Sequence, residues 1–426
     1  MGRFNRLKLL FGLILFPTLL FGQFNNNTTS PYSRYGIGDL QDYTFGRTSA
    51  MGGAAIASRY NRQINLANPA SYSAIDSLGF MFEIGMNGRG SKFSTDSMSS
   101  STNDTNFQYF AMNFKVSKYV GAALGLKPFS DAGYDVTVIE DIDNVGNTYT
   151  RYYGAGTISR AFFGLGVSPI KNLSLGANLY YSFGLLNHSA VIYFLDDYDY
   201  YLVQQYRTLR ISDFSFEFGA QATIPFGTDQ KIIIGAVLEN KPKYNGFTSD
   251  ITVKNITYGS TGEQDTLNFT EEEKGYIEYP VSFGIGLSYV KENVLEINAD
   301  YFHQSWGKAK FFGEESSFLT DLNKFAVGAE WIPDKFSIRG YLNRVSYRAG
   351  LTYKQSYLKF VNKQINDVGI TFGVGLPIYR SNSTINVAAE FGRSGTRENN
   401  LVLENYARLN VSVNLYDLWF IKRKFD

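Results

Sequence analysis

The sequence of 426 residues contains no cysteine, two histidines and three tryptophans. Without cysteine, neither disulfide bonds nor thiol chemistry can contribute. The histidines, His188 and His303, are too few for a zinc site of the usual type. A Gly-x-Ser-x-Gly motif and the third glycine of a dinucleotide-binding loop are also missing. We therefore expect no enzyme, no metal site and no cofactor, with a serine and histidine pair inside a barrel as the alternative.

Beyond the first 22 residues, the sequence has no apolar run long enough to cross a membrane as a helix. Residues 1–8 are basic, residues 9–21 are mostly apolar, and the small residue Gly22 precedes Gln23. This order predicts a cleaved signal peptide over residues 1–22, with an uncleaved signal anchor as the alternative. If the mature chain resides in a membrane, it does so as a closed β-barrel.

The charge balance gives no sign of nucleic-acid binding. The formal net charge is +1, and Arg3, Arg6 and Lys8 belong to the leader, which leaves 37 basic and 39 acidic residues. The mature chain then carries a balance of −2, without the basic excess of a nucleic-acid-binding protein.

From Gly79 onward, apolar residues recur at every second position, which is the pattern of a half-buried strand. Val281, Phe283, Ile285 and Leu287, for example, alternate with serine and glycine. The turns between such runs predict about fourteen antiparallel strands, an all-β fold with the even number typical of bacterial outer-membrane barrels. We expect the strands to begin near Gly79, Phe107, Val120, Thr150, Leu173, Tyr206, Lys231, Tyr276, Val294, Asn323, Arg344, Asp367, Ser383 and Tyr406.

The links between the runs are unequal in length. Residues 169–172 form a short link, whereas residues 254–274 read as a long polar loop. Short periplasmic turns and long outer loops produce such an asymmetry. The transmembrane barrel is thus predicted to cover residues 79–426, in the outer membrane.

Alternation alone does not say which face of the strands meets lipid. The large strand number, the leader and the charged residues on the less apolar face favour lipid outside and water inside. A secreted protein of several sheets is the alternative. The carboxylates that we expect in the lumen are Glu217, Glu296, Asp300, Glu330 and Glu390.

Residues 23–78 precede the strands and show no period-2 pattern. Their stretch 30–73 is rich in glycine and alanine, which permit close backbone contact, and it carries four arginines that require polar partners. These properties predict a plug inside the lumen, and a flexible leader is the alternative. The expected plug residues are Arg34, Arg47, Gly52, Gly53, Arg59, Arg62, Asn68, Pro69 and Ala70.

The order of Met51-Gly52-Gly53-Ala54, then Asn68-Pro69-Ala70, then a many-stranded barrel resembles the FadL family of outer-membrane transporters. The sequence of residues 30–36 and the motif Glu404-Asn405-Tyr406 near the C-terminus resemble sequences from the branch of that family found in Bacteroidota. The resemblance implies a barrel of about fourteen strands with an N-terminal hatch, carrying hydrophobic molecules inward. Some relatives instead serve as accessory subunits of secretion or assembly machines.

The third predicted strand is interrupted in its middle. Pro128 has no N–H group for a sheet hydrogen bond, and Gly133 permits a positive φ. Together with the FadL resemblance, this predicts a lateral opening, and an ordinary turn is the alternative. The residues expected at the opening are Pro128, Phe129, Ser130, Asp131 and Gly133.

Two acidic runs have the oxygen ligands that calcium prefers, residues 141–146 and 196–199, but Val145 breaks the EF-hand pattern and solvated loop tips are the better interpretation of both. Two functions are considered, and the sequence favours the first. The first is passage of a hydrophobic or amphipathic small molecule through the outer membrane, and the second is a non-transporting subunit of a secretion or barrel-assembly complex. The expected partners are outer-membrane lipids with either a hydrophobic ligand or a larger outer-membrane complex, and no nucleic acid.

Overall fold

The computed structural model describes residues 27–41, 45–143, 145–194, 202–240, 242–255 and 264–419. The predicted signal peptide and the acidic run at 196–199 lie outside these residues. Among the described residues, no helix is both long and apolar enough to cross a membrane.

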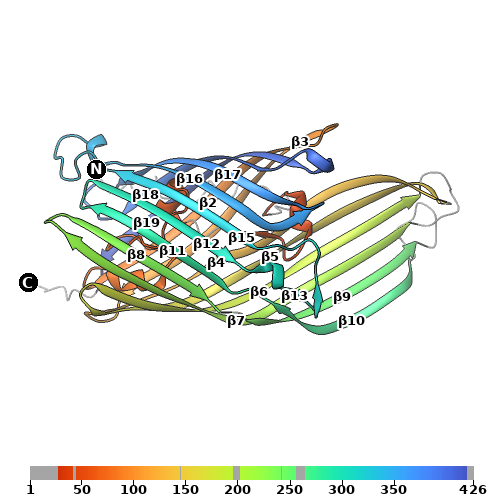
Figure 1. Cartoon of the computed structure of the whole chain (residues 1–426), viewed down its shortest axis with the longest axis horizontal. Helices are drawn as coiled ribbons and strands as arrows, with labels where there is room; N and C mark the ends of the chain where they lie inside the picture. The colour runs from red at the N-terminus through yellow and green to blue at the C-terminus, as the bar shows by residue number, and fades with distance from the viewer. Residues whose placement is uncertain are drawn as a thin grey trace, which may run out of the picture.

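The chain forms one antiparallel sheet that closes on itself (Figure 1). Its last strand pairs with its first long strand from Leu403↔Ser94 to Leu418↔Gly79. The wall strands are β2 (Gly79–Ser94), β3 (Ser99–Lys115), β4 (Val120–Ile142), β5 (Gly146–Ile170), β6 (Leu173–Phe194), β7 (Val203–Phe226), β8 (Gln230–Glu239), β9 (Lys243–Asn255), β10 (Gln264–Glu278), β11 (Ser282–Lys291), β12 (Leu295–Gln304), β15 (Leu322–Trp331), β16 (Ser346–Phe360), β17 (Lys363–Pro377), β18 (Thr384–Gly395) and β19 (Leu403–Leu418).

Two of the wall strands are broken in the middle. β8 and β9 both pair with β7, so together they form one strand across the wall. β11 pairs with β8 and β10 pairs with β9, so β10 and β11 together form the next strand. Pro242 and Pro280 lie at the two breaks, where proline interrupts a ladder at little cost. Counted in this way, the described part of the wall has fourteen strands, and the predicted outer-membrane barrel is confirmed.

The apolar face of the wall points outward. Along β11, Phe283, Ile285 and Leu287 are exposed, whereas the intervening Gly284 and Gly286 are buried. The same alternation runs through β6 and β19. Apolar side chains therefore face the lipid, and the small and polar side chains face the interior.

The two ends of the barrel differ. Short turns at 171–172, 227–229 and 292–294 mark one end, which we assign to the periplasm. At the other end β4, β5, β6, β7, β9 and β10 reach beyond the other wall strands (Figure 1). The predicted long loop at 254–274 is wrong from Gln264 onward, because β10 begins there and pairs with β9. An exposed hairpin outside the bilayer has no apolar face, so alternation could not reveal it.

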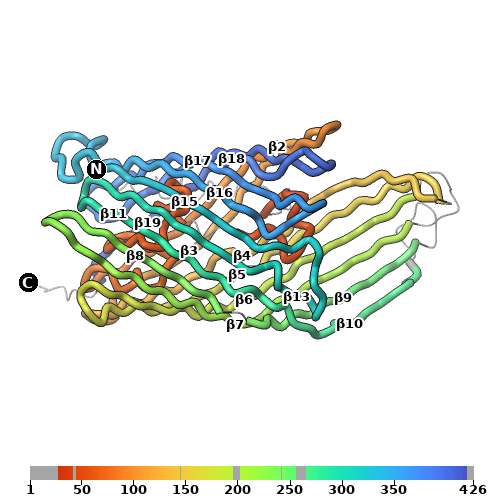
Figure 2. Tube along the Cα trace, in the orientation of Figure 1, coloured from red at the N-terminus to blue at the C-terminus, as the bar shows by residue number. Residues whose placement is uncertain are grey.

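The interior holds the N-terminal segment, by which we mean the described residues between 27 and 78, and the connection 305–321. Figure 2 shows the N-terminal trace, in red, within the strands. The segment contains η2 (Pro31–Arg34), β1 (Asp39–Leu40), η3 (Gly46–Met51) and η4 (Pro69–Ala74), and the connection contains η5 (Trp306–Lys308), β13 (Lys310–Phe311) and β14 (Glu314–Glu315). Two further 3-10 turns, η6 (Leu342–Arg344) and η7 (Glu398–Asn400), lie between wall strands.

Candidate functional site

The N-terminal segment lies directly on the inner face of the wall. η3 contacts β15 to β19, and η4 contacts β3 to β7, so the two turns touch opposite parts of the barrel. The wall has glycines at these contacts: a Cβ on Gly176 would collide with the backbone of Pro69, and one on Gly121 would collide with Tyr72. The small inward-facing residues therefore let two backbones approach each other.

The Asn68-Pro69-Ala70 motif anchors η4. The Asn68 amide Nδ2 donates to the carbonyl oxygens of Ile56 at 2.9 Å, Ala220 at 3.2 Å and Ala236 at 3.3 Å, and its Oδ1 accepts from the Ala70 N–H at 3.0 Å. Asn68 thus joins the segment to two neighbouring wall strands, β7 and β8. It also caps the turn that Pro69 begins.

Gly52 and Gly53 end η3. Gly52 has φ of 64°, the left-handed conformation that favours glycine, and its N–H donates to Thr371 Oγ1 at 2.9 Å. The N–H of Gly53 donates back to the Thr48 carbonyl at 3.0 Å. The pair therefore reverses the chain while it is held against β17.

The four arginines of the segment have different partners. Arg47 forms ion pairs with two of the expected lumen carboxylates, Glu296 at 2.8 Å and Glu330 at 2.9 Å. Arg62 pairs with Asp76 at 3.0 Å at the surface, and the Arg34 guanidinium lies 3.6 Å from the ring centre of Tyr152.

Arg59 bonds to neutral oxygen atoms of Ala70, Ser73, Ser168 and Gln221, at 3.0 to 3.3 Å. Burial without a carboxylate partner lowers the pKa of Arg59 to about 10. The alternation that located the carboxylates could not assign each arginine to a partner, because the segment itself has no regular period.

The five expected carboxylates all face the interior. Asp300 accepts the backbone N–H groups of Ala55 at 2.5 Å and Ile56 at 2.8 Å. Glu390 pairs with Arg408 at 3.1 Å, on the wall itself. Glu296, Glu330 and Asp300 thus hold the N-terminal segment, whereas Glu390 links two wall strands.

β3 and β4 do not pair with each other in the outer half of the wall. The two strands pair from Lys115↔Gly121 to Phe110↔Leu126, and no further pair joins them in the described chain. Beyond that point β4 bulges at Phe129, between Pro128 and Ser130, while it stays paired with β5. β1 supplies the missing ladder, because Leu40 pairs with Ser130 and Asp39 with Asp131.

The start of the N-terminal segment lies in this gap. On one side, Thr29 bonds to Thr102 at 2.7 Å and Asn106 donates to the Asn27 carbonyl at 2.6 Å, both from β3. On the other side, Asn27 donates to Asp131 at 3.0 Å and the Ser33 hydroxyl to the Gly133 carbonyl at 3.1 Å, both on β4. Residues 27–33 therefore bridge the two strands that do not pair with each other.

A row of aromatic rings crosses the lumen behind the gap. Phe129 contacts Tyr279 with 5.5 Å between ring centres, Tyr279 contacts Trp306 at 5.3 Å, and Trp306 contacts Tyr357 at 4.9 Å. These four residues, the aromatic row, are all buried and belong to an apolar cluster that includes Ile37 and Leu40. Beside the cluster lies a cavity of about 60 Å³. Engineered cavities that hold benzene measure about 150 Å³, so this one is smaller than an aromatic ligand needs.

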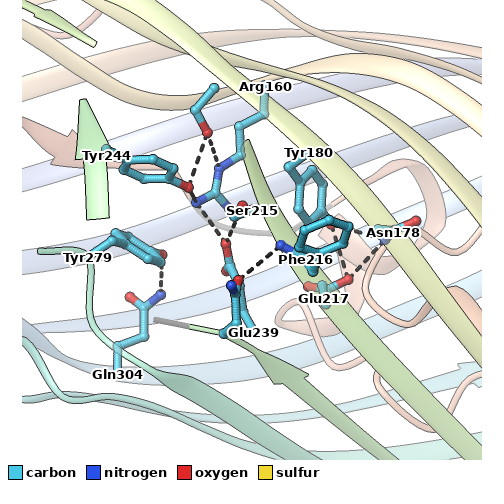
Figure 3. A network of polar contacts seen from close by, with 12 residues as sticks. Arg160, Asn178, Tyr180, Ser215, Phe216, Glu217, Glu239, Tyr244, Tyr279 and Gln304 are labelled. Atoms are coloured by element: carbon cyan, nitrogen blue, oxygen red, sulfur yellow. Dashed lines mark hydrogen bonds and ion pairs between the residues drawn. The ribbon is translucent and has the colours of Figure 1, made fainter. Parts of the chain in front are cut away.

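A buried ionic network adjoins the row (Figure 3). Arg160, with none of its side chain exposed, pairs with Glu239 at 2.9 Å and lies 3.7 Å from the ring centre of Phe129. Glu217 accepts from Asn178 at 2.9 Å and from Tyr180 at 3.1 Å. The network therefore joins β5, β6, β7 and β8 next to the bulge.

Sequence reasoning missed Arg160, Glu239 and Lys127. Lys127 donates to Tyr180 at 3.2 Å and is the strand partner of Arg160. The signal was present, since each of the three is a charged residue at an inward position beside an apolar run. A charge at such a position needs a buried partner.

The two histidines lie on different strands and have separate partners. His188 bonds to Tyr134 at 2.8 Å and His303 to Asn323 at 2.9 Å, far apart on the wall. Among the described residues no group of acidic or histidine side chains could hold a metal ion. Larger cavities lie at the ends of the barrel. One of about 880 Å³ lies at the periplasmic end, and one of about 720 Å³, lined by Arg34, Tyr134 and His188, lies at the outer end.

Comparison with solved structures shows the same fold. The chain is similar to the Pseudomonas putida toluene transporter TodX, with 17% identity over 90% of this chain and 99% of that one and a TM-score of 0.57. The Ralstonia pickettii toluene transporter TbuX has 16% identity over 88% of this chain and 98% of that one, with a TM-score of 0.56. A Pseudomonas aeruginosa FadL homologue has 11% identity over 90% of this chain and 100% of that one, with a TM-score of 0.57. At these identities the likeness establishes the FadL-type barrel alone.

A comparison with curated proteins finds no match. A family model does match, over residues 6–426, which include the N-terminal segment and the whole wall. The chain is a member of the BamG family.

Proposed function

We propose that this chain is a non-transporting accessory subunit of an outer-membrane secretion or barrel-assembly complex, with the N-terminal segment as its plug. The observation that carries the proposal is the filled middle of the lumen, between the cavities at its two ends. The aromatic row crosses the lumen beside a cavity of about 60 Å³, well below the roughly 300–1,000 Å³ of ligand pockets.

The bridged gap supports the same function. In a transporter with a lateral outlet, the space between β3 and β4 would serve the ligand, but here residues 27–33 bond to both strands. Membership of the BamG family favours a subunit over a free-standing channel.

Affinity purification of the tagged chain from outer membranes in mild detergent tests this proposal. We expect stable copurification with a larger outer-membrane barrel, which an unrelated barrel with the same tag does not capture. Recovery of a lone barrel that holds lipid or detergent in its lumen would overturn the proposal.

The second candidate is passage of a hydrophobic or amphipathic small molecule, and the bulge in β4 favours it. The bulge at Phe129 lies where the wall is unpaired, and only the N-terminal segment separates that point from the bilayer in the described chain. Displacement of residues 27–33 would give an apolar ligand a sideways route into the membrane. TodX and TbuX, which share the fold, are described as toluene transporters.

A double-cysteine variant separates the two functions. Leu40 and Ser130 are antiparallel partners, and such pairs have Cα atoms about 4.5–5.5 Å apart, within the range of a disulfide. If the gap conducts, oxidised Leu40→Cys/Ser130→Cys loses uptake of a radiolabelled long-chain fatty acid, whereas a cross-link between the paired wall residues Ala389 and Leu409 does not. Uptake that is absent in the wild type, or unchanged by the first cross-link, rejects passage through the gap.

A further inference from the structure

The periplasmic end of the barrel has a large cavity that the proposed function does not use. Its volume of about 880 Å³ lies in the upper range of ligand-binding pockets. It is bounded by the N-terminal segment on one side and by four periplasmic turns on the other. Its charged lining residues are Arg47, Arg59, Arg62, Lys171, Lys231, Lys291, Lys335, Glu292, Glu296 and Glu330.

This lining is strongly cationic. It contains seven basic and three acidic side chains, a formal charge of +4, or +3 when Asp76, the ion-pair partner of Arg62, is included. The acidic ones already have partners: Arg47 pairs with both Glu296 and Glu330, and Lys231 pairs with Glu292 at 3.0 Å. The positive charge of the cavity is therefore not balanced by its own carboxylates.

Two of the cations bond only to neutral groups in the described contacts. The Arg59 guanidinium donates to carbonyl, amide and hydroxyl oxygens, and the Lys335 ammonium donates to Asn293 Oδ1 at 2.8 Å. Burial lowers the pKa of both side chains, that of Arg59 to about 10. An anion in the cavity would relieve the cost of burying these charges.

The spacing of the lysines selects the kind of anion. Lys171 lies in the turn that enters β6 and Lys335 follows β15, and the wall order between these strands is β6, β7, β8, β11, β12, β15. Five spacings of about 4.8 Å separate them, which is roughly 24 Å along the wall. A single phosphate group is too small to reach across this distance, whereas about seven residues of extended peptide span it.

We propose that this cavity binds an acidic, extended polypeptide segment that reaches it from the periplasm. Carboxylates along the segment would pair with Lys171, Lys291 and Lys335, and one further carboxylate would reach the Arg59 guanidinium. The inference deepens the proposed function. It rests on that function only in assigning the bound segment to a partner subunit of the complex.

Peptide binding to the purified full chain in detergent tests the inference. The probe is a fluorescein-labelled peptide of eight glutamates, followed by fluorescence anisotropy at about 50 mM and about 500 mM salt. We expect saturable binding that weakens at high salt. In Lys171→Gln/Lys291→Gln/Lys335→Gln we expect affinity to fall by about tenfold, equivalent to about 1.4 kcal/mol.

A matched variant controls for net charge. Lys92→Gln/Lys359→Gln/Lys363→Gln removes the same charge near the outer end, away from the cavity, and should bind as the wild type does. Equal losses in the two variants would show nonspecific attraction and overturn the site. Binding of inorganic phosphate without binding of the peptide would overturn the polypeptide ligand. Because copurification tests the complex separately, failure of peptide binding alone refutes this inference and leaves the proposed function standing.

Discussion

Arg47 and Glu296 form an ion pair across 249 positions of the sequence, with 2.8 Å between Nη2 and Oε2. Both side chains are about nine-tenths buried, and Tyr60 stacks on the guanidinium with 3.6 Å from its ring centre to the Arg47 Cζ atom. A single residue of the N-terminal segment thus carries the charge that compensates Glu296 on β12 and shares in compensating Glu330 on β15.

Replacement of Arg47 should loosen the N-terminal segment. Arg47→Met leaves Glu296 buried without its cation, and breaking a buried pair from one side costs about 3–5 kcal/mol. We expect faster proteolysis within residues 45–78 and a lower midpoint of urea unfolding. Glu296→Gln in the same chain should restore part of the loss.

The control for this prediction is Arg62→Met. Its ion pair with Asp76 is exposed, so the change should cost less than about 1 kcal/mol. Equal proteolysis of the two variants would contradict the role assigned to Arg47.

A side chain at Gly176 should displace η4. The Cβ atom in Gly176→Val would collide with Pro69, while the outward face of β6 stays unchanged. We expect an inserted barrel whose N-terminal segment is open to protease. Gly88→Val is the matched control, because the nearest atoms to its Cβ lie 3.9 Å away, and protease resistance that survives Gly176→Val would count against the docking described above.

Removal of one ring should open the lumen. Trp306→Ala takes the central member out of the aromatic row, at a cost of about 3–5 kcal/mol and with a new cavity. In planar bilayers we expect higher single-channel conductance than in the wild type. Trp331→Ala, at a residue that is 52% exposed on the outer face, should leave conductance unchanged, and identical conductance of the wild type and both variants would refute the closure.

Deletion of residues 30–73 should leave an inserted barrel that leaks small polar solutes. The segment fills the space between opposite wall strands, and its loss leaves the polar inner face hydrated. Swelling of proteoliposomes in sugar solutions measures the leak. A folded deletion variant as tight as the full chain would show that residues 30–73 are not a plug.

Export predicts the mature N-terminus. If residues 1–22 are a signal peptide, protein from the outer-membrane fraction begins at or near Gln23 and migrates differently before and after heating. Sequencing of the N-terminus checks the first point and electrophoresis the second. Uncleaved protein in the cytosol would contradict both.

The wall was predictable because its physics is local. Each strand crosses one bilayer with one face in lipid, so alternation appears within ten residues, and β2, β4 and β6 begin at the expected residues Gly79, Val120 and Leu173. The bulge in the third strand was equally visible, since Pro128 beside it acts on its own backbone, whereas Gly133 pairs regularly with Ala155 and contributes no irregularity. That it forms an opening stays a prediction.

Partners across the lumen were not predictable in the same way. Arg47 pairs with carboxylates that we expected in the lumen, but Arg34 lies against a tyrosine ring and Arg59 bonds to neutral oxygen atoms. The ion pair between Arg160 and Glu239 was not predicted. Each of these contacts joins positions far apart in the chain, and their choice depends on how the segment folds inside the wall. β10 escaped notice for another reason, because outside the bilayer a strand needs no apolar face.

The seam of the barrel also joins the N-terminal segment to the closure of the wall. β2 follows the N-terminal segment directly at Gly79, and β19 pairs with β2 while the backbone N–H of Trp419 donates to the carbonyl of Leu78. A wall without β19 would have an open side next to β2, at the point where the segment is attached. The topology therefore allows the ring to close around the segment, without threading the segment through a finished barrel.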